Sequence, residues 1–206
     1  MAAGRSTRDG VSARERLLEA AVECIAEEGY YRASSNQIAR RAGLTWGVIQ
    51  HHFGTREQLL LEVVREGAQD LLATFEKAQI DGDTPLERLE SLADVAWSHY
   101  CTPEFLVRVQ IVMNLSRDPT TATETVEALS ELAERTTSGW QRLVDQVVAP
   151  KRQPPGLSTA LFQILRGVAV GEELLESMVA GKQSRRPRKG ERKLLLRALA
   201  TQLEGV

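Results

Sequence analysis

The segment that decides the fold spans residues 34–60 and reads SSNQIARRAGLTWGVIQHHFGTREQLL. Ser34, followed three residues later by Gln37, fits a capping box and predicts the start of a short helix. Gly43 ends that helix and can adopt the positive φ that reverses the chain, and Thr45 is placed to cap a second short helix. Two short helices joined by a turn that contains glycine are typical of a helix-turn-helix.

The flanking sequence supplies a helix on each side of this motif. Apolar spacing predicts a helix from about Ser12 to Glu28, and Thr55 with Gln58 repeats the capping-box pattern before a long helix to about Gln79. Three helices with a short second one meet the geometric description of a DNA-binding helix-turn-helix. Helix pairs of this kind also occur in proteins that never contact DNA, so the geometry alone leaves DNA binding open.

Helical periodicity continues through the rest of the chain, and no alternating strand-like segment bounded by turn residues is found in the sequence. Caps, prolines and apolar spacing predict further helices at about 85–100, 103–113, 123–148, 158–180 and 191–203. The predicted fold class is therefore all-α, with about nine helices.

Composition limits the class of protein. The chain has 206 residues, 42% of them hydrophobic, and a net charge of -2, so any DNA contact has to be local rather than spread over a basic surface. The apolar runs fall far short of the roughly 20 residues that span a bilayer, and the first residues lack the apolar stretch of a secretion signal. We expect a cytoplasmic protein in which Cys24 and Cys101 are small buried hydrophobes and form no disulfide.

The central segment also carries a longer and more specific pattern. Ile38-Ala39-x-x-Ala42-Gly43 is followed by a short helix that ends in His52-Phe53, then by a small residue, a base and Glu57-x-Leu59. This pattern resembles the signature of the TetR family of bacterial regulators. The resemblance implies a helix-turn-helix DNA-binding domain at 1–55 and a ligand-binding and dimerisation domain at 56–206.

The resemblance also implies a function. It predicts a DNA-binding transcriptional regulator, a repressor released from a palindromic operator when a small apolar ligand moves the connecting helix at about 56–79. The implied partners are double-stranded DNA, a small-molecule effector and a second copy of the chain, which pairs through the helices at about 158–180 and 191–203. No cofactor, metal or membrane partner is expected. The open alternative is a helical protein-interaction adaptor that binds no DNA.

The resemblance implies DNA contacts for particular residues of the matched segment. The residues expected near base edges are Asn36, Trp46, Gly47 and Gln50. The residues expected at phosphates are Ser35, Thr45, His51 and Arg56.

Gln50 departs from the family pattern, which commonly has a tyrosine at this position. Glutamine can bond adenine bidentately in the major groove, so the base preference is expected to differ. Two residues near Gln50, Trp46 and Gly47, each have a second interpretation. Trp46 can instead cover the turn as a packing residue, and Gly47 can simply permit close approach of the backbone to DNA.

Several other polar residues need an interpretation. Arg56 lies at a helix N-terminal turn, where a cation opposes the helix dipole, and this points to an external anion such as phosphate. His51 and His52 are helix neighbours that diverge by about 100°, which does not suit a metal site. Basic residues of the N-terminal arm either reach DNA or form a solvated tail. They are Arg5, Arg8, Arg14 and Arg16.

The C-terminal part holds most of the aromatic residues, at helical spacing. With a few polar groups they can line an apolar ligand pocket, although ordinary core packing is the alternative for each of them. The candidates are Trp97, Tyr100, Phe105, Gln110, Met113, Asn114, Trp140 and Phe162.

The helix predicted at about 158–180 is the most apolar one. Its apolar residues spread around more of the helix than one internal face needs, and Gly167 and Gly171 permit close crossing, so we expect a four-helix interface with a second copy. A buried central helix is the alternative. The basic stretch 185–189 is interpreted as a solvated connection to the last helix.

An enzyme is not expected from this sequence. It has no Gly-rich phosphate loop and no Ser-His-Asp or Cys-His arrangement with supporting spacing, and its histidines number only three.

Overall fold

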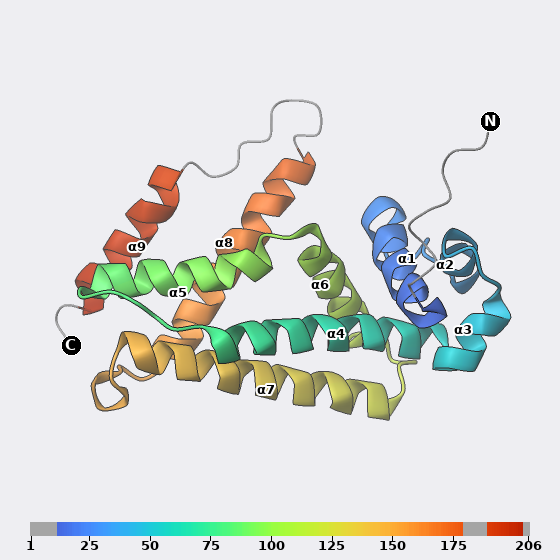
Figure 1. The fold of residues 1–206 in the computed structure, drawn as a ribbon, viewed down its shortest axis with the longest axis horizontal. Coiled ribbons are helices and arrows are strands. Elements are labelled where there is room, and N and C mark those ends of the chain that lie inside the picture. Colours follow the sequence, from blue (N-terminus) through green and yellow to red (C-terminus); the bar gives the residue numbers. More distant parts are fainter. Residues whose placement is uncertain (1–11, 179–188, 204–206) are drawn as a thin grey trace. The chain divides into compact units, whose positions relative to one another are not determined.

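The structure is a computed structural model that describes residues 12–178 and 189–203. Within these residues every regular element is helical, as Figure 1 shows. The elements are α1 (Ala13–Glu28), α2 (Ser35–Arg41), α3 (Trp46–Phe53), α4 (Arg56–Lys77), α5 (Pro85–Tyr100), α6 (Pro103–Leu115), α7 (Thr123–Val147), the 3-10 turn η1 (Pro150–Arg152), α8 (Leu157–Met178) and α9 (Lys189–Leu203). The predicted all-α class and its nine α-helices are confirmed for the described residues.

Several helices begin at the capping residues that were predicted from the sequence. Ser12, Ser34 and Thr84 each accept a hydrogen bond from the backbone N–H three residues later, and the side chain of that later residue returns to the N–H of the cap. These reciprocal bonds satisfy donors that a helix start otherwise leaves free. At α4, Thr55 Oγ1 accepts from the N–H of Gln58 at 3.1 Å.

Gly43 makes the turn between α2 and α3. Its φ is 67°, and the N–H of Leu44 just beyond it donates to the carbonyl of Ala39 at 2.8 Å. Residues with a Cβ rarely adopt this conformation, which is why the turn needs glycine. The predicted positive φ is confirmed.

Contacts divide the chain into two compact units. Unit one contains the described parts of residues 1–67 and 107–130, and unit two contains those of 68–106 and 131–206. Unit one therefore combines α1, α2, α3 and the first half of α4 with most of α6 and the start of α7. The assignment of DNA binding to 1–55 stays a prediction about function, since the compact unit includes more of the chain.

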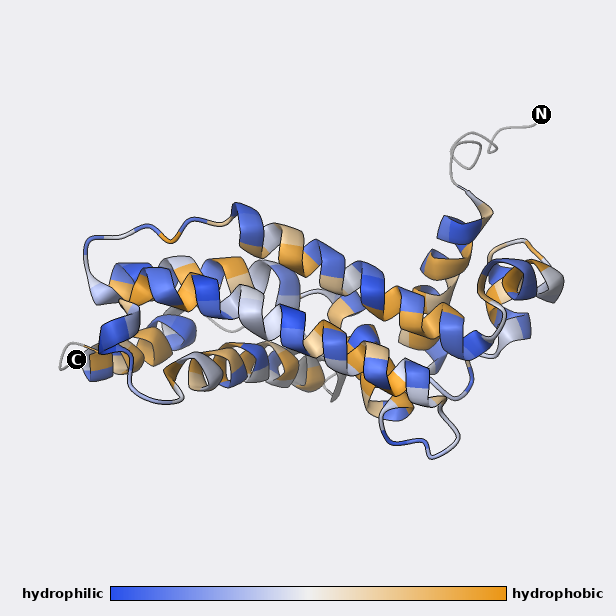
Figure 2. Cartoon of the chain, turned by 90° about the horizontal axis from the view of Figure 1, so that it is seen from below, coloured by the Kyte–Doolittle hydropathy of each residue, from blue (hydrophilic) through white to orange (hydrophobic). Residues whose placement is uncertain are grey.

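Unit one has an apolar core between α1, α2 and α3, which contact one another. Figure 2 shows hydrophobic and hydrophilic residues alternating in bands along the helices, as amphipathic packing requires. Cys24 lies in this core as a small buried residue, and burial raises the pKa of its thiol. The principal core side chains are Leu17, Leu18, Ala21, Cys24, Ile25, Ile38, Ala39, Ile49, Leu59 and Leu60.

Unit two is built on α5, which contacts both α8 and α9. Two indole N–H groups are satisfied by backbone carbonyls: Trp97 Nε1 donates to Leu165 at 3.0 Å, and Trp140 Nε1 donates to Ser158 at 2.9 Å. These bonds hold α8 and its N-terminal turn against two tryptophans that are themselves buried.

The prediction that both cysteines are buried was wrong for Cys101. This residue follows the last residue of α5 and is exposed, because the chain leaves the apolar face of the helix after Tyr100. Both thiols are free. None of the described helices is long and apolar enough to cross a membrane.

Candidate nucleic-acid interface

The candidate interface is the outer face of α3. Thr45, Trp46, Gly47, Gln50 and His51 are all exposed, and Trp46 is exposed to 48%. Residues at these spacings share one side of a helix. The opposite side holds Ile49, which is buried in the core of unit one. The structure therefore brings five of the predicted DNA-contact residues onto one solvent-facing surface.

Thr45 precedes α3 with an extended backbone, as expected for a cap. Its side chain makes no capping hydrogen bond, although the backbone conformation is that of an N-cap. The hydroxyl is thus not occupied by the N–H groups of the first turn. It stands at a helix N-terminus, where free N–H groups and the helix dipole favour an anion.

Gly47 is not required by the fold. A Cβ built at this position would meet Thr45 Oγ1 at 3.7 Å, which is an ordinary van der Waals contact, and its φ is not positive. A glycine inside a helix weakens the helix by roughly 0.5–1 kcal/mol relative to alanine. Packing within unit one therefore gives no reason for this glycine.

The second helix presents the remaining candidates. Asn36 is exposed and Ser35 is half-buried on the first turn of α2. Arg41 on the last turn is held by α1, because its guanidinium hydrogen-bonds to Glu27 and lies 3.5 Å from Glu23. The bond from Arg41 lowers the pKa of Glu27. Sequence reasoning assigned no role to Arg41, which helps to fix α2 on α1.

Arg56 has internal partners that the sequence did not reveal. Its Nε donates to the carbonyl of Ala33 at 2.8 Å, its Nη2 donates to that of Tyr30 at 2.6 Å, and its guanidinium lies 4.5 Å from the centre of the Tyr30 ring. These contacts tie the loop between α1 and α2 to the start of α4. An external anion is therefore not needed to explain the position of Arg56, and its phosphate contact stays a prediction.

Two arginines of the predicted N-terminal arm belong to α1 and are used inside unit one. Arg14 bonds Glu62 and Glu66 at 2.7 and 2.8 Å, and Arg16 donates to the carbonyl of Ala42. The arm interpretation was wrong for these two residues, because the helix begins before them and directs them towards other helices. Arg5 and Arg8 lie outside the described residues.

The start of α4 is also joined to the start of α7. Thr125 is fully buried, donates to Glu57 Oε1 and accepts from Gln58 Nε2 at 3.1 Å. The N–H of Ala122 donates to the same Glu57 oxygen at 3.3 Å. The amide of Gln58, predicted to return to Thr55, is directed to Thr125 instead, since α7 supplies a buried hydroxyl that a local sequence pattern does not show.

The two histidines of α3 are exposed and lie edge to face, with ring centres 5.1 Å apart. Among the described residues, no three His, Cys, Asp or Glu side chains are grouped so that they could hold a metal ion.

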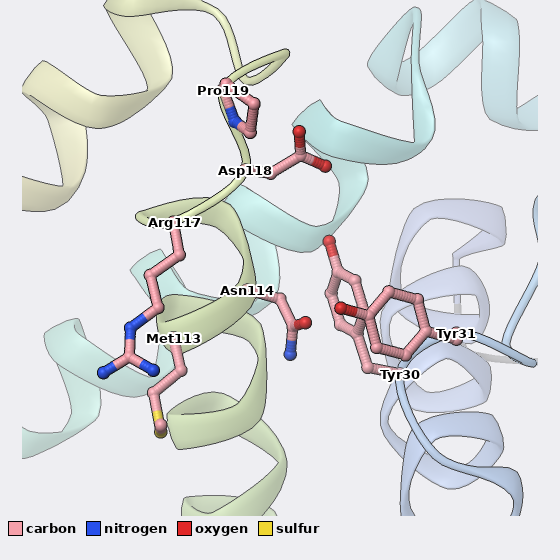
Figure 3. A pocket seen from close by; sticks show the side chains of 7 residues that line it. All are labelled: Tyr30, Tyr31, Met113, Asn114, Arg117, Asp118 and Pro119. Carbon is pink, nitrogen blue, oxygen red and sulfur yellow. The ribbon is translucent and has the colours of Figure 1, made fainter.

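A cavity of about 420 Å³ lies within unit one, and Figure 3 shows its lining. Tyr30 and Tyr31 come from the loop after α1 and face the end of α6 and the loop that follows it. The lining residues are Tyr30, Tyr31, Met113, Asn114, Arg117, Asp118 and Pro119.

The predicted ligand residues fall into two groups. Met113 and Asn114 line the cavity in unit one, and the Asn114 amide donates to the backbone carbonyl of Gln110 at 2.8 Å. The aromatic candidates all belong to unit two. They are Trp97, Tyr100, Phe105, Trp140 and Phe162.

The geometry of α2, Gly43 and α3 is that of a helix-turn-helix. Residues 17–63 match the family model of the bacterial regulatory proteins of the tetR family. This segment of the chain, which contains α2 and α3, is therefore similar to the N-terminal segment of that family.

Two relatives are similar to this chain over part of its length. The chain is 35% identical to the HTH-type transcriptional regulator BetI of Agrobacterium fabrum over 92 residues, 44% of this chain and 45% of the relative. It is 39% identical to the HTH-type transcriptional repressor AcnR of Corynebacterium efficiens over 64 residues, 31% of this chain and 34% of the relative. These matches span less than half the length of either relative.

The fold likeness extends over nearly the whole chain. The crystal structure of the TetR family transcriptional regulator PfmR from Thermus thermophilus superposes with a TM-score of 0.63 at 21% identity, covering 94% of this chain and 96% of that one. At this identity the likeness shows a shared fold.

Proposed function

We propose that the protein is a DNA-binding transcriptional repressor that leaves a palindromic operator when a small molecule binds. The observation that carries the proposal is the outer face of α3, where Trp46, Gln50 and His51 are exposed on a helix whose other side is packed. The names of the matched relatives, a transcriptional regulator and a transcriptional repressor, support it. Acting on bacterial DNA, the protein would work in the cytoplasm.

In this proposal α3 enters the major groove. Gln50 and Trp46 approach base edges, while Thr45 and His51 approach phosphates on either side. Gly47 lets the helix backbone come close to the DNA, because glycine has no side chain that would hold the two apart. Arg56 holds the loop behind the motif and thereby keeps α2 and α3 in place.

A second copy of the chain completes the proposed regulator. On α8, Ala160 and Gly167 are exposed, and a Cβ at Gly167 or Gly171 would meet no described atom within 4 Å. On α9, Leu194 is 70% exposed. Ala160, Gly167 and Gly171 are spaced seven and four residues apart, so they lie along one side of α8. Because these residues are small, a partner helix can approach closely along this stripe.

The test of DNA binding begins with selection of genomic fragments by the purified full-length protein. Fluorescence anisotropy then measures the affinity for a selected duplex at several salt concentrations. We expect the logarithm of the association constant to fall linearly and steeply with the logarithm of salt concentration, because phosphate contacts release counterions. No enrichment, or a salt-independent affinity, would support the protein-interaction adaptor instead.

The test of the dimer uses two matched substitutions. Ala160→Glu places a charge on the proposed stripe of α8, whereas Ala133→Glu places one on an exposed position of α7. We expect sedimentation to show a dimer for the native protein and for Ala133→Glu, and a monomer for Ala160→Glu. A dimer for all three proteins would contradict this interface.

A further inference from the structure

Unit two contains a cluster of aromatic rings with a cation at its side. The Tyr100 ring centre lies 4.8 Å from that of Phe105 and 6.2 Å from that of Phe162, and Phe162 lies 5.7 Å from Trp140. These residues come from α5, α6, α7 and α8. The two phenylalanines have no polar side-chain atoms, and the N–H of Trp140 donates to a backbone carbonyl. One hydroxyl stands apart.

Tyr100 is the polar group of this cluster without a partner. Tyr100 is only 2% exposed, and its hydroxyl makes no hydrogen bond in the part of the chain that the structure describes. Burial raises the pKa of Tyr100, so the phenol stays protonated and offers a donor. A buried donor without an acceptor loses its hydrogen bonds to water and gains none in return, which makes such a group rare unless something binds it.

Arg166 supplies the cation. Its guanidinium carbon lies 5.5 Å from the ring centre of Phe105 and 5.7 Å from that of Phe162. Within the described residues Arg166 forms no ion pair, whereas in the same unit Arg192 pairs with Glu172 and Lys193 pairs with Glu90. The charge of Arg166 is close enough to act on Tyr100, whose pKa it lowers against the larger effect of burial.

We propose that this cluster binds an organic anion with an apolar body, and that this anion is the effector of the repressor. Its carboxylate accepts the hydrogen bond of Tyr100 and pairs with Arg166, while its apolar part contacts the rings of Phe105 and Phe162. A neutral apolar molecule would leave the buried hydroxyl of Tyr100 without an acceptor and Arg166 without an anion. This identification of the effector class rests on the proposed function, but binding of the anion does not.

The experiment measures binding of defined probes to the full-length protein by calorimetry. The probes are 1-naphthoate and octanoate, each compared with an uncharged counterpart, 1-naphthamide and 1-octanol. The two acids distinguish an aromatic body from an acyl chain. The variants are Arg166→Gln, Tyr100→Phe and the control Arg142→Gln, which removes an exposed arginine of α7 in the same unit.

We expect at least one acid to bind about tenfold or more tightly than its uncharged counterpart, because charge-assisted hydrogen bonds are the stronger ones. Arg166→Gln should abolish this preference, and Arg142→Gln should leave it intact. Tyr100→Phe should weaken acid binding about tenfold while raising the thermal midpoint of the free protein, since the unpartnered hydroxyl is gone. That rise separates loss of a contact from loss of the fold.

Three results would overturn the proposal: no binding of either acid, equal binding of acids and uncharged probes, or equal losses in Arg166→Gln and Arg142→Gln. Operator binding by the ligand-free protein is measured separately. Anion binding without DNA binding would refute the proposed function and the effector role that rests on it, and would leave the anion site standing. DNA binding without anion preference would refute this inference alone.

Discussion

Arg56 lies across the ring of Tyr30, with its guanidinium 4.5 Å from the ring centre and its Nη2 bonded to the Tyr30 carbonyl at 2.6 Å. The contact joins the first turn of α4 to the loop that carries α2 and α3. A residue expected from sequence to contact DNA phosphate is therefore also part of the frame that holds the motif.

This relationship predicts a large effect of Arg56→Ala on stability. Two hydrogen bonds and a cation–π contact are lost, so we expect the free energy of unfolding to fall by roughly 2–3 kcal/mol. Urea denaturation at a fixed protein concentration measures it. Arg56→Lys keeps the charge but not the two-donor fork, and should recover little of the loss. Full stability in both variants would contradict the positioning role and leave phosphate contact as the explanation.

Gln50 is predicted to read a base. Gln50→Ala should relax the preference at one position of each half-site by about 1–3 kcal/mol and leave the other positions unchanged. Anisotropy with a set of singly substituted operators measures this. Glu19→Ala on the exposed face of α1 is the control. A uniform loss on every operator would show that Gln50 makes no base-specific contact.

Gly47 and Gly43 form a matched pair, because only one of them is required by the backbone. Gly47→Ala should stabilise the protein by about 0.5–1 kcal/mol while weakening operator binding, since the added methyl group faces DNA. Gly43 has a φ of 67°, so Gly43→Ala should cost about 1–2 kcal/mol of stability. Thermal unfolding and anisotropy together separate the two effects. Unchanged DNA affinity in Gly47→Ala would refute the close approach at this position.

Thr125 is predicted to stabilise the junction between α4 and α7. Thr125→Val removes the hydroxyl that bonds Glu57 and Gln58, and should lower the free energy of unfolding by about 1–3 kcal/mol. Thr137→Val, at an exposed position of α7, is the control and should change it by less than about 0.5 kcal/mol. Similar values for the two variants would show that the buried network contributes little.

Most of the fold could be predicted because its signals act over a few residues. A capping box joins Ser34 to Gln37, and Gly43 ends a helix through its own φ, so both are visible in a short stretch of sequence. The outer face of α3 follows from helical spacing for the same reason. Cys101 was misjudged because one residue beyond a helix end no longer follows its periodicity.

The partners of charged side chains could not be predicted in this way. Arg14 bonds Glu66, which is 52 residues away, and Arg56 bonds carbonyls 23 and 26 residues away. Such bonds depend on which helices cross and on which polar atoms a crossing leaves exposed, and neither is encoded in local spacing.

The sequence by itself determined the helix-turn-helix, its caps and the face of α3 that meets solvent, because turn and cap chemistry is local. Only the tertiary structure decided that Arg56 ties the motif to α4, that the candidate ligand residues separate into two groups, and that the hydroxyl of Tyr100 has no partner among the described residues. Burial and pairing are properties of distant residues brought together, and they exist only once the helices have packed.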